Sequence, residues 1–427
     1  MMNHRQGIVA ISPLIFFIAI YLMSSLIAGD FYKMPITIAF LLSCMYAIAI
    51  YRRKPLKGRI DTFCTGAGEK NIMLMLCIFV LAGAFANSAK DVGCIEATVN
   101  LTLSILPENM IMVGLFIATC FVSLSIGTSV GTIVALTPIA AGLAHSTGTS
   151  VPLMTAVIVG GSFFGDNLSF ISDTTIVATS TQGCKQSDKF FVNLYTVIPS
   201  ALATMVMYFF IGSGTKAPAS IPDVDFIKVL PYLIVIASAL MGVNVLVVLS
   251  LGILSTGIIG LTYGSYDFFG WCQSMANGIT NMGELIVVTV LAGGLLKILN
   301  ENGALDYLIR LMTAKIRSRR SSELTIAMLV CIVNICTANN TVAILTVGSI
   351  SRNIAERYGV DKRKCASILD SFSCCTQSIL PYGAQILMAT GLAATSPISI
   401  IMYLYYPVVL FAVSIIAILI RYPKKFS

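Results

Sequence analysis

Apolar runs long enough to cross a lipid bilayer follow one another along most of this sequence. A bilayer core takes about 20 apolar residues per helix, and the run from Ile8 to Ala28 already reaches that length. No small-residue cleavage site leads from it into a polar domain, so we expect a helix rather than a cleaved signal peptide. Only 11% of the residues are charged, which is far fewer than in soluble domains. The sequence therefore excludes a soluble globular enzyme and predicts an all-α polytopic membrane protein.

The basic residues are unevenly spread, and their placement predicts the topology. Cytoplasmic loops carry an excess of Lys and Arg, and the basic clusters here lie at 52–70, 315–320, 352–364 and 421–425. Cytoplasmic N- and C-termini put all these clusters on one side of the cell membrane. The net charge of +8 is then explained by the orientation of the protein in the membrane. We therefore expect the lipid bilayer, and not nucleic acid, as a partner. The lysines left outside are Lys33, Lys90, Lys216 and Lys228. The predicted crossings are 8–28, 35–51, 71–89, 151–182, 190–213, 227–241, 245–263, 284–299, 365–394 and 398–420.

Two further apolar segments, 110–144 and 322–350, are interrupted near their middles by polar, flexible sequence. Basic clusters flank the second segment on both sides, and a single crossing would place one of them outside. A re-entrant hairpin keeps both inside. We therefore predict a hairpin in each segment, with tips at Gly127–Thr132 and Thr337–Thr341. The alternative is two more ordinary crossings, which would make twelve.

Short sequence matches occur in the same order in the two halves of the chain. Leu81-Ala82-Gly83 recurs about 210 residues later as Leu291-Ala292-Gly293, by the kind of fixed-period similarity that marks internal repeats. Further pairs follow in register: Gly93 with Gly303, Thr128 with Thr337, Thr132 with Thr341, Ser162 with Ser371, and Ser169 with Ser378. The charge pattern gives the copies opposite orientations. Inverted repeats are typical of secondary transporters, whose site lies near the membrane midplane. We predict copies at 71–213 and 281–427, a peripheral helix pair in 1–70 and a connecting pair in 214–280.

Three aspartates, Asp166, Asp173 and Asp370, lie inside apolar segments. A charge at the bilayer centre costs on the order of 2.5–3.5 kcal/mol on insertion scales and is functional by default. Asp166 and Asp173 are about two helical turns apart, which places them on one face of a continuous helix. We expect a small alkali cation at these two residues. Packing between helices is the alternative role for the neighbouring hydroxyls.

The polar stretches around these aspartates predict broken helices. Glycines precede Asp166, and Pro381 and Gly383 interrupt the second stretch. Unwound backbone survives at membrane depth only where it is buried or lines a cavity, and its carbonyls and oxygen side chains suit a small alkali cation. The predicted ion- or substrate-binding residues are Asp166, Asn167, Ser169, Ser172, Asp173, Thr174, Thr128, Ser129, Asn339, Asn340, Thr341, Asp370 and Gln377.

Conventional cofactor chemistry has little support in this composition. His4 and His145 are the only histidines, which is too few for a histidine-based metal site or triad. The twelve cysteines show no CxxC pair and are expected to fill apolar space. We therefore expect no catalytic residues and no cofactor.

The motif from Gly165 to Thr175 resembles the signature of the NhaC family of Na⁺/H⁺ antiporters. The stretch from Leu369 to Gln385 is similar to that family's C-terminal motif, and the tip Gly127-Thr128-Ser129 is similar as well. The resemblance spans roughly 71–420. It departs at Phe170, where the family usually has proline, and this affects the backbone bend rather than the ligands. The resemblance implies inverted repeats, re-entrant hairpins and Na⁺/H⁺ exchange. The family also holds members thought to move organic acids or amino acids with Na⁺, so the substrate stays open.

Three functions follow as hypotheses. In the first, cytoplasmic Na⁺ exchanges for external H⁺ because one buried aspartate, Asp166 or Asp173, holds either ion but not both. In the second, the chain is a Na⁺- or H⁺-coupled transporter of an organic acid or amino acid. No Lys or Arg lies between 91 and 184 or between 365 and 420, so we expect no buried base to meet a carboxylate, although helix N-termini could replace one. The third and remote alternative is an intramembrane aspartyl protease. The sequence allows a homodimer but does not determine the oligomeric state.

Overall fold

The computed structural model describes residues 4–28, 34–170, 172–214, 223–313, 316–423 and 426, and every regular element within them is helical. Some residues of the sequence predictions lie outside the described residues. They are Ile171 of the predicted motif, Lys33, Lys216 and Lys315 of the predicted loops, and Lys424 and Lys425 of the tail. The helices of the first half are α1 (His4–Ala28), α2 (Ile36–Ile50), α3 (Leu56–Ala67), α4 (Lys70–Val92), α5 (Cys94–Ile105), the 3₁₀ turn η1 (Glu108–Met110), α6 (Ile111–Ile126), α7 (Ser129–Thr147), α8 (Val151–Leu168), α9 (Asp173–Gln182) and α10 (Gln186–Gly212).

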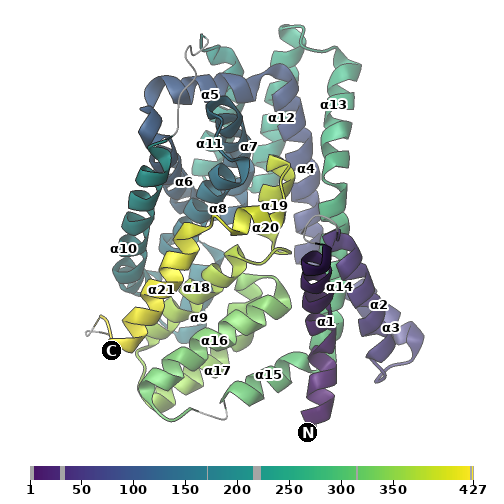
Figure 1. Cartoon of the computed structure of the whole chain (residues 1–427), viewed down its shortest axis with the longest axis vertical. Coiled ribbons are helices and arrows are strands. Elements are labelled where there is room, and N and C mark those ends of the chain that lie inside the picture. Colours follow the sequence, from purple (N-terminus) through teal and green to yellow (C-terminus); the bar gives the residue numbers. More distant parts are fainter. Residues whose placement is uncertain are drawn as a thin grey trace.

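The second half of the chain is also helical in every regular element that the structure describes. Its helices are α11 (Phe226–Leu240), α12 (Val245–Thr262), α13 (Phe268–Asn281), α14 (Gly283–Glu301), α15 (Ala304–Thr313), α16 (Arg319–Thr337), α17 (Asn340–Tyr358), α18 (Lys362–Ser378), α19 (Ala384–Ala393), α20 (Pro397–Ile401) and α21 (Tyr405–Leu419). Figure 1 shows the whole bundle, with the chain coloured from purple at the N-terminus to yellow at the C-terminus.

Seven segments of the described chain are long and apolar enough to cross a membrane. They are Ile72–Val92, Ser129–Thr147, Val151–Gln182, Gln186–Gly212, Val245–Thr262, Gly283–Glu301 and Arg319–Thr337. Shorter apolar helices accompany them, among them Ile36–Ile50 and Tyr405–Leu419. The prediction of an all-α polytopic membrane protein is thereby confirmed. The number of crossings stays a prediction, because α7 and α16, the predicted hairpin arms, are themselves long enough to cross.

Glycines let the two halves pack on each other at two matching helix crossings. In one, α3 packs on α14, and a Cβ on Gly66 would lie 2.5 Å from the carbonyl oxygen of Gly293. In the other, α13 packs on α4, and a Cβ on Gly83 would lie 2.5 Å from the carbonyl oxygen of Gly278. Small residues allow such close helix contacts in membranes. The repeated Leu-Ala-Gly triplet thus marks the place where each half touches the other.

The helix pairs that precede each predicted copy occupy matching positions. From the first pair, α2 packs on α14, whereas from the second pair α12 packs on α4. Each pair therefore leans on the long helix of the opposite half. The division of the chain into two copies, a peripheral pair and a connecting pair stays a prediction.

Each half contains a helical hairpin and a broken helix. The first hairpin, α6–α7, turns at Gly127 with φ 72°, and the second, α16–α17, turns at Ala338 with φ 50°. The broken helices are α8–α9, interrupted over 169–172, and α18–α19, interrupted over 379–383. In Figure 1, α7, α8 and α19 lie together in the upper half of the bundle, and α17, α18 and α9 lie together in the lower half. The breaks and the hairpin tips therefore meet between the two halves.

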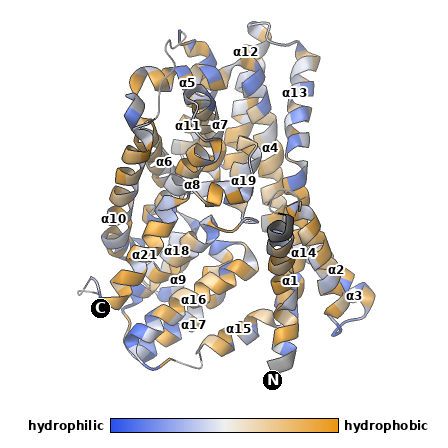
Figure 2. Ribbon diagram, in the orientation of Figure 1, coloured by the Kyte–Doolittle hydropathy of each residue, from blue (hydrophilic) through white to orange (hydrophobic). Residues whose placement is uncertain are grey.

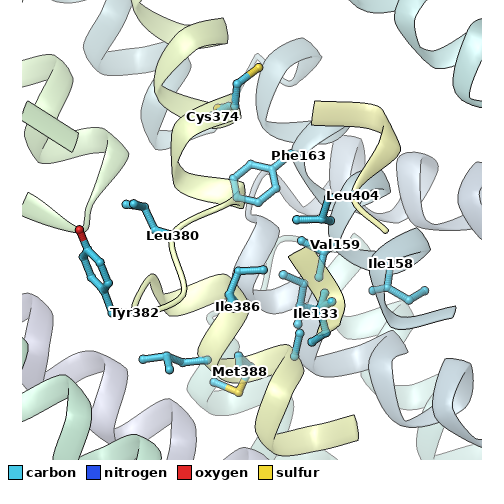
Figure 3. Close-up of a cluster of buried hydrophobic side chains, with 14 of the residues drawn as sticks. Ile133, Ile158, Val159, Phe163, Cys374, Leu380, Tyr382, Ile386, Met388 and Leu404 are labelled. Carbon is cyan, nitrogen blue, oxygen red and sulfur yellow. The ribbon is translucent and has the colours of Figure 1, made fainter. Parts of the chain in front are cut away.

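Apolar side chains pack around the helix breaks. Figure 3 shows Val159 and Phe163 of α8 near Ile386 of α19, with Leu380 and Tyr382 on the turn between α18 and α19. All five side chains are buried. Because interiors pack densely, this arrangement holds the unwound segments in place and keeps bulk water from their apolar side.

The basic segments gather at one end of the bundle. The N-terminus, α3, α15 and the C-terminus all lie toward the lower end in Figure 1. Hydrophilic residues also concentrate near the lower ends of α3 and α17, whereas the helices between are mostly hydrophobic (Figure 2). Ion pairs form among these segments, including Lys54 with Glu301 at 2.5 Å and Lys364 with Glu323 at 3.1 Å. The lower end of the bundle in Figure 1 thus carries these basic segments.

Candidate functional site

A cavity of about 400 Å³ lies where the two hairpin tips face the two helix breaks. Its lining includes the carboxylates of Asp166 and Asp173 and no Lys, Arg or His among the described residues. The predicted site residues that line it are Thr128, Ser129, Asp166, Asp173, Thr174, Asn339, Asn340, Thr341 and Gln377. The turn at Gly242-Val243-Asn244 closes one side. The charged residues of the described lining are therefore acidic, which suits a cation.

Asp166 is buried at the end of α8, with 4% of its surface exposed. Its carboxylate accepts a hydrogen bond from the backbone N–H of Ser129, 3.2 Å away, at the first residue of α7. The N-terminus of a helix carries partial positive charge, so α7 stabilises the carboxylate from one side. A buried carboxylate needs further neutralisation, which a bound Na⁺ or a proton would supply.

Five helices begin at this cavity. They are α7, α9, α12, α17 and α19, whose first residues or caps are among its lining. Two of these N-termini meet a carboxylate, since Ser129 donates to Asp166 and Asp173 is the first residue of α9. The N-terminus of α17 is capped by Asn339, whose side chain accepts from the Val342 N–H at 3.0 Å. The converging dipoles leave room for an anionic group as well as a cation.

The hydroxyl groups after the break hold its backbone in place. The carbonyl oxygen of Asp166 accepts hydrogen bonds from Ser172 at 3.0 Å and from Thr174 and Thr175 at 3.5 and 3.4 Å. Ser172 also caps α9, accepting from the Thr175 N–H at 3.3 Å. Ser169 is the C-cap residue that follows α8, and it is buried. Ser169 and Ser172 thus lie at the break rather than on the cavity wall.

A chain of hydrogen bonds joins the two halves beside the cavity. Gln385 donates from Nε2 to Ser129 Oγ at 3.0 Å, and its Oε1 accepts from Gln377 Nε2 at 3.0 Å. The same Gln377 nitrogen donates to the carbonyl oxygen of Ala338 at 3.1 Å. The chain therefore runs from one hairpin tip to the other through both parts of the broken helix α18–α19. Gln377 was predicted as a site residue from the sequence, whereas Gln385, the second residue of α19, was not.

The expected burial of Asp173 is wrong. Its side chain is exposed, although it lines the cavity. The expectation assumed two continuous helical turns from Asp166, but α8 ends at Leu168 and a new helix begins at Asp173. The two aspartates therefore differ in environment, and the assignment of Na⁺ to both of them stays a prediction.

A second polar cluster lies beside the cavity and not in its wall. Asn167 and Asp370 meet there, with Asn167 Nδ2 donating to Asp370 Oδ2 at 3.1 Å. Asn193 Nδ2 donates to the same carboxylate oxygen at 2.9 Å, and Tyr406 donates from its hydroxyl to Asn167 Oδ1 at 3.1 Å. Lys189 completes the cluster with an ion pair to Asp370 at 2.8 Å. All five side chains are fully buried.

Lys189 contradicts the expectation of no buried base, although the carboxylate it meets belongs to Asp370 of the protein and not to a substrate. The expectation failed because the predicted crossing began at 190 and left Lys189 in a loop, whereas α10 begins at Gln186 and carries the lysine inward. One signal was available in the sequence. Lys189 and Asn193 are four residues apart, so a helix presents them on one face, and both interrupt an otherwise apolar run.

The position that departs from the family pattern packs against a neighbouring aromatic ring. Phe170 lies in the break and stacks on Phe190 with ring centroids 4.6 Å apart. Aromatic pairs of this kind stabilise contacts beyond simple burial. Phe170 thus gives the unwound segment a contact with α10, and the bend at the break forms without proline.

Known proteins resemble the chain along most of its length. The Na⁺/H⁺ antiporter family matches residues 7–213 and 224–424. The chain is 24% identical to the Na(+)/H(+) antiporter NhaC of Bacillus subtilis (strain 168), over 86% of this chain and 87% of that protein. It is 23% identical to the protein of the same name from Alkalihalophilus pseudofirmus, with coverages of 83% and 82%.

Two further proteins are similar to the chain. The Malate-2H(+)/Na(+)-lactate antiporter of Bacillus subtilis is 22% identical, over 90% of this chain and 89% of that protein. Among solved structures, the YdaH transporter of Alcanivorax borkumensis gives a TM-score of 0.44 at 12% identity, covering 91% of this chain and 99% of that one.

Proposed function

Because the chain belongs to the Na⁺/H⁺ antiporter family, we propose that it exchanges Na⁺ for H⁺ across a membrane at the cavity that Asp166 lines. The motif resemblance to NhaC is confirmed by the relatives of that name. One observation carries the proposal. A buried carboxylate faces a cavity with no basic side chain among its described lining residues, at the junction of two broken helices and two hairpin tips.

Competition for Asp166 is sufficient to couple the two ions. When Na⁺ occupies the cavity, the carboxylate and nearby oxygens of Thr128 and Thr174 supply hard ligands. When Na⁺ leaves, a proton neutralises the same buried carboxylate. Movement of one half against the other would expose the site to each side in turn. Because the carboxylate holds one ion at a time, each reorientation carries either Na⁺ or H⁺.

A Na⁺- or H⁺-coupled organic acid or amino acid transporter is the second candidate. The cavity of about 400 Å³ lies in the range of small-molecule pockets, and three of the five helix N-termini that line it, those of α12, α17 and α19, face no carboxylate of their own. One relative is named for malate and lactate. Na⁺/H⁺ exchange is the simpler proposal, because the two carboxylates of the lining favour cations over anions.

The protease alternative has no support in the site. It requires two carboxylates that act together on one water molecule, whereas Asp166 is buried and Asp173 is exposed. The similar proteins are antiporters.

We also propose the orientation and surroundings of the chain. Cytoplasmic N- and C-termini in the cell membrane fit the gathering of basic segments at one end of the bundle (Figure 1). The proposed ligands are the transported Na⁺ and H⁺. Neither a homodimer nor a monomer is favoured by the contacts within the chain.

Exchange in proteoliposomes tests the proposal. With an imposed pH gradient and a pH-sensitive dye inside the vesicles, added Na⁺ should collapse the gradient through the wild-type protein. Asp166→Asn should abolish the response, since an amide neither binds a proton nor balances Na⁺. Asp306→Asn, on an exposed face of α15, is the matched control and should exchange normally. Normal exchange by Asp166→Asn would refute the assignment.

Organic substrates provide the second arm of the same experiment. A panel of organic acids and amino acids, added with and without a Na⁺ gradient, should leave the dye signal and labelled uptake unchanged if the chain exchanges only cations. Saturable, Na⁺-dependent uptake of one of them would favour the second candidate.

A further inference from the structure

The ammonium group of Lys189 lies among three oxygen atoms from three different helical segments. It lies 2.8 Å from Asp370 Oδ2 on α18, 2.8 Å from the carbonyl oxygen of Asn167 at the end of α8, and 2.6 Å from Thr175 Oγ1 on α9. Lys189, Asp370 and Asn167 are completely buried, and Thr175 is nearly so. A carboxylate, a backbone carbonyl and a hydroxyl thus surround one positive charge that has no access to water.

These oxygens are the ligand types that bind an alkali cation. Hard cations take carboxylate, carbonyl and hydroxyl oxygens. The carbonyl of Asn167 lies in the last turn of α8, which ends one residue later, and it accepts from Asn193 Nδ2 at 2.7 Å as well as from Lys189. Two further oxygens of the cluster, Asp370 Oδ1 and Asn193 Oδ1, are buried without a hydrogen-bond partner among the described residues. The cluster therefore holds more acceptor oxygens than Lys189 uses.

We propose that this cluster is a second cation site, occupied by the side chain of Lys189 as a permanent tethered cation. The lysine takes the place that a free Na⁺ would fill, and it cannot exchange with solution because its backbone is fixed in α10. The assignment of transport to the other site rests on the proposed function. The occupancy of this site by Lys189 does not.

The tethered charge has a structural consequence for the transport site. Lys189 bridges Asn167 before the break and Thr175 after it, and anchors both to Asp370 of the second half. Asp166 and Asn167 are neighbours in sequence, yet one contacts the hairpin tip at Ser129 and the other contacts Asp370. A fixed cation thus lies next to the exchangeable one, and only the cavity site is left for a mobile Na⁺.

Removing the tethered charge should create a binding site for Na⁺. In Lys189→Ala, the buried carboxylate of Asp370 loses its partner, which is strongly unfavourable, and a Na⁺ ion can restore the neutralisation. The Asp166→Asn background removes the contribution of the cavity site. Thermal unfolding of the purified full-length protein is compared in NaCl and in choline chloride, since choline is too large for the cluster.

The expected result is a gain of Na⁺ response on loss of Lys189. Asp166→Asn/Lys189→Ala should unfold several degrees higher in NaCl than in choline chloride, as a ligand that binds the folded state stabilises it. Asp166→Asn alone should show a smaller difference between the two salts. The triple variant Asp166→Asn/Lys189→Ala/Asp370→Asn, which also lacks the carboxylate, should lose the added Na⁺ response.

The other possible results of this experiment either support or overturn the proposed cation site. A folded double variant with no added Na⁺ response, or a triple variant that responds as strongly as the double, overturns the proposal. If the double variant folds only in Na⁺, the proposal is supported. If it fails to fold in both salts while the triple variant folds, Lys189 is only a structural partner of Asp370 and the proposal is overturned. Absence of Na⁺/H⁺ exchange by the wild-type protein would refute the proposed function and leave this measurement unaffected.

Discussion

The backbone N–H of Ser129 donates a hydrogen bond to the carboxylate of Asp166 across 3.2 Å. This contact joins the first residue of α7 to the last turn of α8, so a hairpin tip reaches the residue that we propose to carry the ions. Hydrogen bonds to charged groups are stronger than those between neutral groups. The position of the hairpin tip is therefore coupled to the charge state of Asp166, and a change of ion at Asp166 can change how tightly the tip is held.

Ser129→Pro should weaken Na⁺ binding, because it removes the backbone donor to Asp166 together with the Ser129 hydroxyl. Ser129 is the first residue of its helix, where proline is tolerated, and Thr128 already has the extended conformation that proline prefers before it. A hydrogen bond to a charged group contributes about 1.5–3 kcal/mol, so apparent Na⁺ affinity should fall about tenfold or more. Na⁺ titration of exchange in proteoliposomes measures this.

The control for that prediction is Ser129→Ala, which keeps the N–H and loses only the hydroxyl that accepts from Gln385. Its Na⁺ affinity should fall less than that of Ser129→Pro. Equal effects of the two substitutions would show that the hydroxyl, and not the backbone contact with Asp166, matters for binding.

Asp173→Asn should reduce exchange less than Asp166→Asn. Asp173 is exposed and lies at the first residue of α9, where a carboxylate interacts with the helix dipole by about 0.3–1 kcal/mol. We expect a few-fold loss of apparent Na⁺ affinity with exchange retained. The initial rate of dye response at a series of Na⁺ concentrations tests this. Complete loss of exchange in Asp173→Asn would instead make the exposed carboxylate the ion carrier.

Gly83→Ala should destabilise the protein by obstructing the contact of α4 with α13. An added Cβ would lie 2.5 Å from the Gly278 carbonyl oxygen, and overpacking of this kind costs about 1–3 kcal/mol. Gly293→Ala should act similarly at the matching crossing. Thermal unfolding in detergent measures the effect. Gly283→Ala is the control, because nothing lies within 4 Å of the added atom; an equal loss there would discount the steric explanation.

Asp361 should make the stability of the α18 N-terminus depend on pH. Burial acts to raise the pKa of Asp361, but hydrogen bonds and charge attraction from Arg363 outweigh it and hold this pKa below its ordinary value of 3.8. A lowered folded-state pKa stabilises the fold above the unfolded pKa, and the stabilisation is lost as the pH falls through the folded value. The wild type should therefore be more stable than Asp361→Asn at neutral pH, and the difference should shrink as the pH falls below about 3.8 and vanish below the lowered pKa of the folded state.

Thermal unfolding of both proteins across this pH range measures the difference. Asp361 also caps α18 by accepting from the Arg363 N–H at 2.8 Å, and asparagine keeps that cap, so the comparison isolates the charge. A difference that persists unchanged at low pH would show that the carboxylate charge does not contribute.

Much of this site follows from the sequence, because the patterns involved are local. Glycines before Asp166 and the Pro381–Gly383 turn predicted interrupted helices. The second helix is interrupted at that turn, whereas the first continues through the glycines and ends at Leu168. The predicted hairpin tips turn at Gly127 and Ala338. Long apolar runs with few charges sufficed to predict a helical membrane protein, since only helices and closed barrels satisfy their backbone in lipid.

The sequence by itself determined where the backbone is interrupted and which chemical groups lie near the interruptions. Only the tertiary structure decided which groups meet. Lys189 and Asp370 pair across the two halves of the chain, Gln385 reaches Ser129 of the opposite half, and Asp173 is exposed because its helix starts anew. The physical reason is that turns and helix breaks depend on neighbouring residues, whereas the burial and pairing of a charge depend on how distant helices pack.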